Sequence, residues 1–155
     1  MWNFAEDLIK WKEAEKRIMD LLNENWFNLI QNPIEKEIDL LIINGGIEIK
    51  KDEYAKKSWN FYIEFECNWK PSWLYRPEKH KLIWWVHTDW EKVYMVYWDK
   101  LKNYVKNKIE ECRLNTTLTS KWFRVVEQWW NWWRTKGLLF PLKEMEIIAD
   151  NLFNY

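Results

Sequence analysis

The chain has 155 residues, with 24 basic and 24 acidic side chains and a formal net charge of zero. This length predicts a single domain, residues 1–155, with its own hydrophobic core, and the charge balance excludes a molecule-wide positive field, so any surface for a polyanion must be local. The two cysteines, Cys67 and Cys112, are too few for a disulfide framework, a four-cysteine zinc site or an iron–sulfur cluster.

The composition also predicts where the protein works. The N-terminal stretch MWNFAEDLIK has no basic segment followed by an apolar one, so we expect no signal peptide. No run approaches 18 apolar residues, so we expect no membrane span. The few cysteines favour a reducing compartment, the cytoplasm. Fifteen tryptophans indicate a nucleotide bias in the gene, as in some viral genomes; for a viral protein the compartment would be the host cytoplasm.

Residues 4–24 carry apolar side chains at helical spacing, which predicts an amphipathic helix. The apolar stripe consists of Phe4, Leu8, Trp11, Ile18 and Leu22. Glu15 lies within this stripe, and a carboxylate on a buried helix face is costly unless it is paired or binds a metal. Either Glu15 lies at the edge of the stripe and reaches solvent, or it belongs to a metal site.

The next five segments have the short apolar or alternating patterns of strands. Residues 38–43, 47–50 and 61–66 are predicted to form a three-stranded meander, whose first tight turn is an Asn-Gly-Gly sequence. Residues 82–87 and 92–98 are predicted to form two further strands.

The last third of the chain is predicted to be mostly helical. Asp99 is placed to begin a helix of about a dozen residues. Residues 121–134 have aromatic side chains nearly all round a helix, so we expect a buried or interfacial helix that ends at Gly137. Pro141 is placed to start a final helix that includes Leu152. The element order predicts an α+β fold with a central mixed sheet of about five strands flanked by helices.

Asp39, Glu48 and Lys50 form the pattern with the clearest chemistry. Glu48 and Lys50 share one face of a predicted strand, and Asp39 lies in the strand before it. Phosphodiester hydrolysis needs an activated water and a positive group at the phosphate. A divalent ion held by carboxylates supplies both, and Mg²⁺ prefers oxygen ligands. The pattern therefore indicates phosphodiester hydrolysis; the alternative is a solvated ion-pair face.

These residues resemble the D…(D/E)-x-K signature of the PD-(D/E)XK nuclease superfamily, whose members have the restriction-endonuclease-like fold. The resemblance implies that Asp39 and Glu48 bind Mg²⁺ or Mn²⁺ together with the main-chain carbonyl of Ile49. It also implies that Lys50 positions or activates the attacking water.

Two longer stretches extend the resemblance. AEKRIMDLL is similar to the first helix of archaeal Holliday-junction resolvases, in which a glutamate completes the metal site, and the matching residue is Glu15. Residues 58–74 are similar to a segment of phage-type members. This similarity places matching positions at Asn60, Glu64 and Ser72, and of these we expect Asn60 and Ser72 to contact nucleic acid.

Other side chains have a functional and a structural interpretation. Lys51, Lys56 and Lys57 are expected to contact phosphates in a nuclease, and otherwise form a solvated loop. The aromatic residues of 121–134 either stack on unpaired bases or pack in the core or a homodimer interface; we favour packing.

His80 and His87, with Asp89, suggest zinc, but no second ligand pair has the spacing of a zinc site, so surface or strand histidines are favoured.

From the pattern of Asp39, Glu48 and Lys50 and its resemblance we expect a metal-dependent deoxyribonuclease, an endonuclease or exonuclease acting on duplex, single-stranded or branched DNA in recombination, repair or processing. The alternatives are a Holliday-junction resolvase, for which a homodimer suits symmetric cutting, and a non-catalytic nucleic-acid-binding or virion-associated protein.

Overall fold

The structure is a computed structural model, and it describes residues 4–25, 27, 29–31, 39–42, 45–52, 54–72, 74–75, 82–89, 91–114, 123–130 and 132–154. Its helices are α1 (Phe4–Glu24), α2 (Ala55–Ser58), α3 (Trp98–Leu114) and α5 (Leu142–Ile148). Its strands are β1 (Ile30–Gln31), β2 (Leu40–Ile42), β3 (Gly45–Lys51), β4 (Asn60–Cys67), β5 (Lys70–Pro71), β6 (Leu82–Thr88), β7 (Lys92–Tyr97), β8 (Arg124–Trp130), β9 (Trp133–Pro141) and β10 (Asn151–Asn154). The predicted α+β class is confirmed. None of the described helices has the length and apolar composition needed to cross a bilayer.

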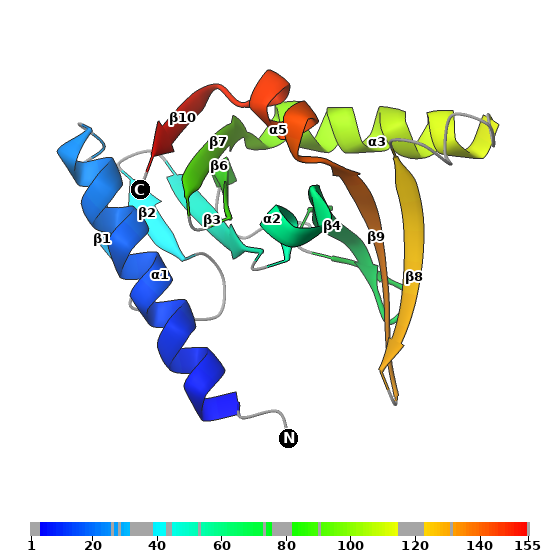
Figure 1. Ribbon diagram of the computed structural model, residues 1–155, viewed down its shortest axis with the longest axis horizontal. Helices are drawn as coiled ribbons and strands as arrows, with labels where there is room; N and C mark the ends of the chain where they lie inside the picture. Colours follow the sequence, from blue (N-terminus) through cyan, green and yellow to red (C-terminus); the bar gives the residue numbers. More distant parts are fainter. Residues whose placement is uncertain are drawn as a thin grey trace.

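The described strands form two sheets (Figure 1). The first has six strands in the order β1-β2-β3-β6-β7-β10, and it is mixed because β3 and β6 run parallel while its other neighbours are antiparallel. The second has four antiparallel strands in the order β5-β4-β9-β8. The first sheet corresponds to the predicted mixed sheet of about five strands, whereas the second sheet was not predicted.

The predicted meander is wrong in its third strand. β2 and β3 pair as expected, with Leu40 opposite Ile47, but β4 pairs with β9 in the second sheet. Asp52 redirects the chain after β3, because its carboxylate accepts hydrogen bonds from the N–H groups of Tyr54 and Tyr62 at 3.0 and 3.2 Å. The other neighbour of β3 is β6, a distant segment that the local pattern could not indicate.

β3 separates two apolar clusters, because its side chains alternate between its faces. Ile47 and Ile49 cluster with Ile18 and Leu22 of α1, and this burial explains the helical spacing of apolar residues in α1. Both glycines of the predicted Asn-Gly-Gly turn lie at the start of β3 and pair with β2. The asparagine lies outside the described residues.

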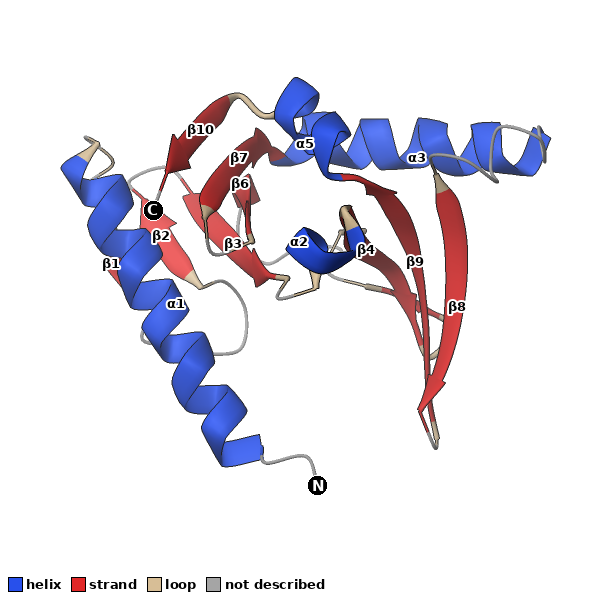
Figure 2. Cartoon of the chain, in the orientation of Figure 1, coloured by secondary structure: helices blue, strands red, loops and turns tan. Residues whose placement is uncertain are grey.

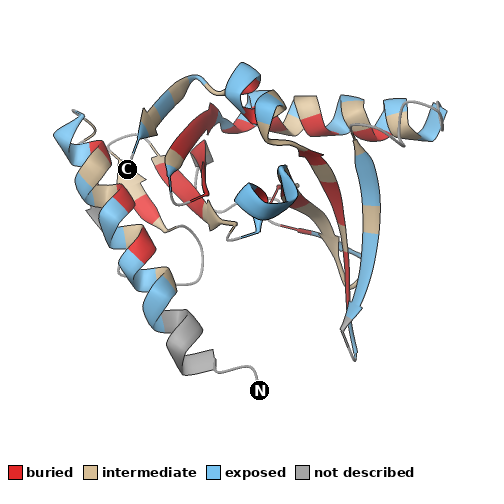
Figure 3. Ribbon diagram, viewed as in Figure 1, coloured by how far each residue is buried: buried red, intermediate tan, exposed pale blue. Residues whose placement is uncertain are grey.

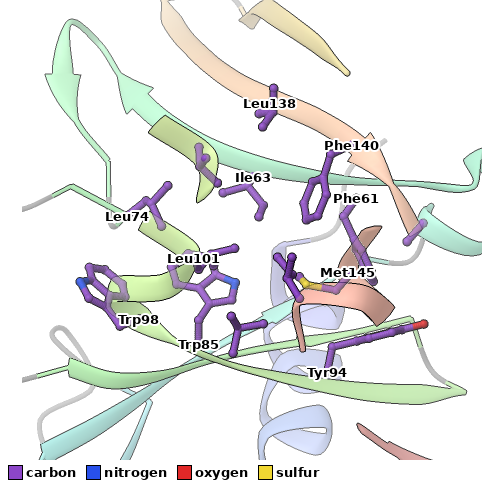
Figure 4. Close-up of a cluster of buried hydrophobic side chains, with 14 of the residues drawn as sticks. Phe61, Ile63, Leu74, Trp85, Tyr94, Trp98, Leu101, Leu138, Phe140 and Met145 are labelled. Carbon is purple, nitrogen blue, oxygen red and sulfur yellow. The ribbon is translucent and has the colours of Figure 1, made fainter. Parts of the chain in front are cut away.

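The larger apolar cluster joins the two sheets (Figure 4). Phe61 of β4 and Phe140 of β9 meet Trp85 and Tyr94 of the first sheet, and α3 and α5 contribute further side chains. The ring centroid of Phe61 lies 5.2 Å from that of Tyr94 and 6.2 Å from that of Phe140. The sheets are therefore held at a fixed relation by aromatic packing.

The predicted helix over residues 121–134 is wrong: the described residues of this stretch form β8 and the start of β9 (Figure 2). Cross-strand pairs run from Arg124 opposite Leu139 to Trp130 opposite Trp133. Apolar residues that surround a helix on all sides also fit a strand pair, and valine and tryptophan favour strands. The tertiary pairing with β4 decides between the two.

The last predicted helix begins after Pro141, as α5, but it ends before Leu152. Asp150 fixes this end, because its N–H donates to the Met95 carbonyl at 2.8 Å and its carboxylate accepts a hydrogen bond from the Tyr97 N–H at 2.9 Å. Leu152 therefore lies in β10, opposite β7.

Gly137, the predicted helix end, lies in β9 and allows a close approach of Tyr62. A Cβ atom at this position would lie 2.2 Å from the Tyr62 ring, whose hydroxyl is 3.1 Å from the hydroxyl of Thr135. We expect Gly137→Ala to displace the ring, break this hydrogen bond and lower the free energy of unfolding by about 1 kcal/mol or more. Urea unfolding measures the change. In a Tyr62→Ala background the same substitution is expected to cost nothing, and an equal loss in both backgrounds would contradict the contact.

Candidate active site

Asp39 is held against β3 at the point where β2 begins. Leu40 lies opposite Ile47 in the antiparallel pair of β2 and β3, so Asp39 lies beside Glu48. There the Ile49 N–H donates a hydrogen bond to Asp39 Oδ2 at 2.5 Å. The carboxylate of Asp39 is thus fixed by a main-chain contact to the residue between Glu48 and Lys50.

Glu48 and Lys50 project from the opposite face of β3 to its isoleucines. The Glu48 residue is only 4% exposed, and its Oε1 accepts a charge-assisted hydrogen bond from Lys50 Nζ. Parallel pairing places Trp85 opposite Glu48 and His87 opposite Lys50 on β6, and Lys50 Nζ lies 5.8 Å from the centroid of the Trp85 ring. Glu48 is too deeply buried for the alternative prediction, a solvated ion-pair face.

The charges around Lys50 keep it protonated. Burial alone would lower the pKa of Lys50, but the carboxylates of Glu48, Asp39 and Glu64 more than offset this effect and raise it above its usual value. Burial raises the pKa of Asp39, although the Lys50 charge and the hydrogen bond from Ile49 act in the opposite direction. The structure therefore brings Asp39, Glu48 and Lys50 together as a compact, mutually charged group.

Glu64 is a further residue of this group, and it comes from the second sheet. Burial raises the pKa of Glu64, and the nearby charge of Lys50 lowers it in part. The sequence contained a signal, because Glu64 is one of the positions matched in the phage-type segment. Its proximity to Lys50 depends on the packing of one sheet on the other, which no strand pattern reveals.

His87 is buried as a neutral side chain beside Lys50. The Trp85 Nε1–H donates to His87 Nδ1 at 3.2 Å, and the Phe61 ring lies 4.4 Å from the imidazole. Burial, together with the Lys50 charge, lowers the pKa of His87 to about 3. This environment suits the predicted strand histidine rather than a zinc ligand.

We expect the buried His87 to make the protein less stable in acid. The unfolded chain takes up a proton as the pH falls below about 6.5, whereas the folded imidazole does not until the pH nears 3. The free energy of unfolding should thus fall by on the order of a few kcal/mol over this window. Urea unfolding at pH 7 and pH 4.5 measures the difference. His87→Asn, whose side chain can still accept from Trp85, should show a smaller difference; an unchanged pH dependence would contradict the assignment.

The other zinc candidates do not gather around His87. His80 lies outside the described residues. Asp89 accepts hydrogen bonds from the N–H groups of Glu91 and Lys92 at 3.0 and 2.8 Å, and so shapes the turn between β6 and β7. Within the part of the chain that the structure describes, no three His, Cys, Asp or Glu side chains are placed to hold a metal ion by themselves.

Glu15 lies half-buried on α1. This helix packs on the face of β3 that carries Ile47 and Ile49, whereas Glu48 and Lys50 occupy the other face. The packing of α1 on β3 does not by itself place Glu15 beside Glu48 and Lys50. A metal-binding role for Glu15 stays a prediction.

The lysines expected to contact phosphates are spread over β3 and α2. Lys51 is half-buried at the end of β3. Lys56 is exposed and pairs with Glu91 across to the β6–β7 turn. Lys57 is exposed, with its Nζ 6.0 Å from the centroid of the Tyr54 ring.

Asn60 and Ser72 have structural contacts in their predicted places. Asn60 Nδ2 donates to the Ser58 carbonyl at 2.6 Å, within the turn that leads into β4. Ser72 is buried, and its hydroxyl donates to the Glu64 carbonyl at 2.5 Å. These bonds hold the turn before β4 and the segment after β5 against β4, and contact of Asn60 or Ser72 with nucleic acid stays a prediction.

The donor set fits a hard divalent ion bound in part by water. Asp39, bonded to the Ile49 N–H, and the buried Glu48 offer carboxylate oxygens, and the main-chain carbonyl of Ile49 is the third ligand that the resemblance implies. Mg²⁺ and Mn²⁺ prefer oxygen ligands, and Mg²⁺ usually keeps several waters and takes only one or two carboxylates. Two carboxylates are therefore enough for such an ion, although not for zinc.

Comparisons with known proteins do not assign the chain to a family. A scan of protein-family models, a search of curated proteins and a search of solved structures each found no match to the chain.

Proposed function

We propose that the protein is a metal-dependent deoxyribonuclease with a restriction-endonuclease-like core. The observation that carries this proposal is the buried Glu48, which shares its face of β3 with Lys50 while Asp39 is bonded to the residue between them. A buried carboxylate is costly unless it is compensated, and a hydrolytic site is a reason to accept that cost. The β2–β3 hairpin, the parallel β6 and the preceding α1 support the choice of core.

Each residue has a defined part in this proposal. Asp39 and Glu48 would hold Mg²⁺ or Mn²⁺, which polarises a phosphoryl oxygen and lowers the pKa of a bound water. Lys50 stays protonated because three carboxylates surround it, so it cannot accept a proton from water at neutral pH. It can donate a hydrogen bond, and we assign it to positioning the attacking water and offsetting negative charge at the phosphate.

The ion pair of Lys50 with Glu48 also bears on the second candidate, a nucleic-acid-binding protein that does not cleave. In the described structure Lys50 holds an oxygen of Glu48, so a metal must share or displace that contact. If it cannot, the same residues serve only to join the two sheets. The ability to bind a divalent ion separates the two functions.

Cleavage assays test the proposal. Labelled single-stranded, duplex and four-way-junction DNA would be incubated with the protein in Mg²⁺, Mn²⁺ or EDTA, with Asp39→Asn as the inactive variant. We expect cleavage of at least one substrate that needs the metal and is lost in the variant. Binding without cleavage under every condition would support the second candidate, and neither binding nor cleavage would refute both.

A further inference from the structure

The β8–β9 hairpin carries a group of exposed tryptophans that the proposed active site does not use. With Trp69 of the neighbouring β4–β5 turn, they form what we call the tryptophan surface. Its members and their exposed fractions are Trp69 at 68%, Trp129 at 60%, Trp132 at 96% and Trp133 at 55%. In Figure 3 the β8 strand is largely exposed, and the far end of the hairpin projects away from α3.

A charged network holds two members of the tryptophan surface, Trp69 and Trp129. The guanidinium of Arg134 lies 4.9 Å from the centroid of the Trp69 ring and 5.8 Å from that of Trp129. Arg134 is ion-paired with Glu66 and with Glu127, and the Trp129 indole N–H donates to Glu127 at 3.1 Å. The indoles of Trp69 and Trp129 are therefore oriented before any ligand arrives, which reduces the entropy cost of binding.

The turn that carries Trp69 is strained for its residues. Asn68 and Trp69 have φ angles of 47° and 61°, in the left-handed region that a bulky side chain rarely adopts. The turn is fastened to β9, because the Arg134 N–H donates to Asn68 Oδ1 at 2.9 Å and the Asn68 N–H donates to the Arg134 carbonyl at 2.8 Å. A glycine would fit the turn without strain, yet the chain places a large exposed indole there.

Cations lie next to the tryptophan surface. A cavity of about 780 Å³ between the end of α3 and the second sheet includes Arg113, Arg124 and Lys136 in its lining, together with Glu66 and Glu127. Lys136 lies two residues after Arg134 and shares its face of β9, and Trp129 of β8 lies opposite Arg134. The cation of the cavity and the Trp129 indole are thus about 7 Å apart along the strand, which corresponds to about two nucleotide steps of a stacked strand. Phosphates at the cavity and bases at the indoles would thus suit one short strand.

We propose that the tryptophan surface binds unpaired bases, so that single-stranded DNA, or the single-stranded part of a branched DNA, is the substrate class. Indole faces beside cations are the usual features of single-strand binding, because every base can stack and the backbone needs positive charge. Paired bases inside a duplex do not offer their faces in this way. Only the statement that this DNA is the substrate rests on the proposed nuclease function; the binding itself does not need cleavage.

The charged network argues against a lipid bilayer as the occupant. Insertion of Trp69 and Trp129 into an apolar phase would carry Arg134, Glu66 and Glu127 with them, and burial of charges is costly. The same charges can stay at the wet edge of a nucleic-acid complex. The strand β4 also connects this surface with the site, since Glu66 lies two residues from Glu64.

Binding in EDTA, where a metal-dependent nuclease is silent, tests this inference. Fluorescence anisotropy would measure the affinity for a labelled twenty-nucleotide oligo(dT) and for a blunt duplex of equal length. We expect tighter binding of oligo(dT), and we expect Trp129→Ala and Trp132→Ala each to weaken it roughly five- to 150-fold, the effect of removing one stacking partner. Trp132→Phe should restore most of the affinity.

A matched control comes from Trp59, which is 71% exposed but lies next to α2, outside the tryptophan surface. Trp59→Ala should leave oligo(dT) binding unchanged. The inference is overturned if oligo(dT) does not bind, if it binds equally to all variants, or if the tryptophan variants instead lose binding to phosphatidylglycerol vesicles or lose self-association in sedimentation. Tryptophan-dependent binding without cleavage by the wild type would refute the nuclease alone, and cleavage without such binding would refute this surface alone.

Discussion

Lys50→Met is expected to abolish cleavage while strengthening the binding of a divalent ion. The substitution keeps the apolar length of the side chain but removes the charge that three carboxylates surround. Loss of one electrostatic contact to the reacting group typically costs about 100- to 1,000-fold in rate. Loss of the competing cation next to Glu48 should raise Mn²⁺ affinity about tenfold or more, since one unit charge at 4 Å is worth about 4 kcal/mol at an effective dielectric of 20.

Calorimetric titration with Mn²⁺ and single-turnover cleavage measure the two effects on the same preparation. Lys92→Met is the matched control, because Lys92 also pairs with a glutamate, Glu146, but lies at the start of β7, outside the candidate site. The control should change neither quantity. If Lys50→Met lowers metal affinity or cleaves at the wild-type rate, Lys50 does not have the position we assign to it.

Phe61→Ala is expected to lower the free energy of unfolding by about 3–5 kcal/mol, the usual cost of removing a buried phenylalanine. Phe61 is fully buried and touches aromatic side chains of both sheets, including His87 and Phe140. A typical domain has only about 5–15 kcal/mol of stability. The substitution should therefore bring the protein close to unfolding at 37 °C.

Urea denaturation followed by circular dichroism measures this loss. Tyr54→Ala is a suitable control, since the side chain of Tyr54 is exposed and a surface substitution usually changes stability by less than about 0.5 kcal/mol. A loss of under about 1 kcal/mol in Phe61→Ala would show that the two sheets do not depend on this contact. The site would then be more loosely built than we infer, because Glu64 reaches Lys50 only through the packing of the two sheets.

Local patterns predicted the elements that carry the chemistry. The helical stripe predicted α1, the alternation of Ile47 to Lys50 predicted β3 with its charged face, and Asp99 marked the first turn of α3. These features have a period that a few consecutive residues define. The placement of Asp39 beside Glu48 followed from the hairpin alone, which is why the core of the site was foreseeable.

Long-range pairing could not be predicted in the same way. Residues 121–134 fit a helix that is apolar on all sides and also a strand pair, and only the contact with β4 decides for strands. The same pairing moved Glu64 and its strand into a second sheet, and it turned an expected packing surface into exposed tryptophans at the end of a hairpin. The burial of His87 beside Lys50 likewise depends on the parallel pairing of β3 with β6.

The most direct test of the account compares Glu48→Gln with Glu146→Gln. Both substitutions remove one carboxylate charge from a glutamate paired with lysine, but only Glu48 lies in the site. Mn²⁺ binding and metal-dependent cleavage would be measured for both variants and the wild type. We predict that Glu48→Gln loses at least about 100-fold in cleavage and binds the metal more weakly, since even residues that only support a metal ligand contribute about 10- to 100-fold, while Glu146→Gln behaves as the wild type. Wild-type cleavage and metal binding in Glu48→Gln would contradict the central claim that this buried glutamate holds the ion for DNA hydrolysis.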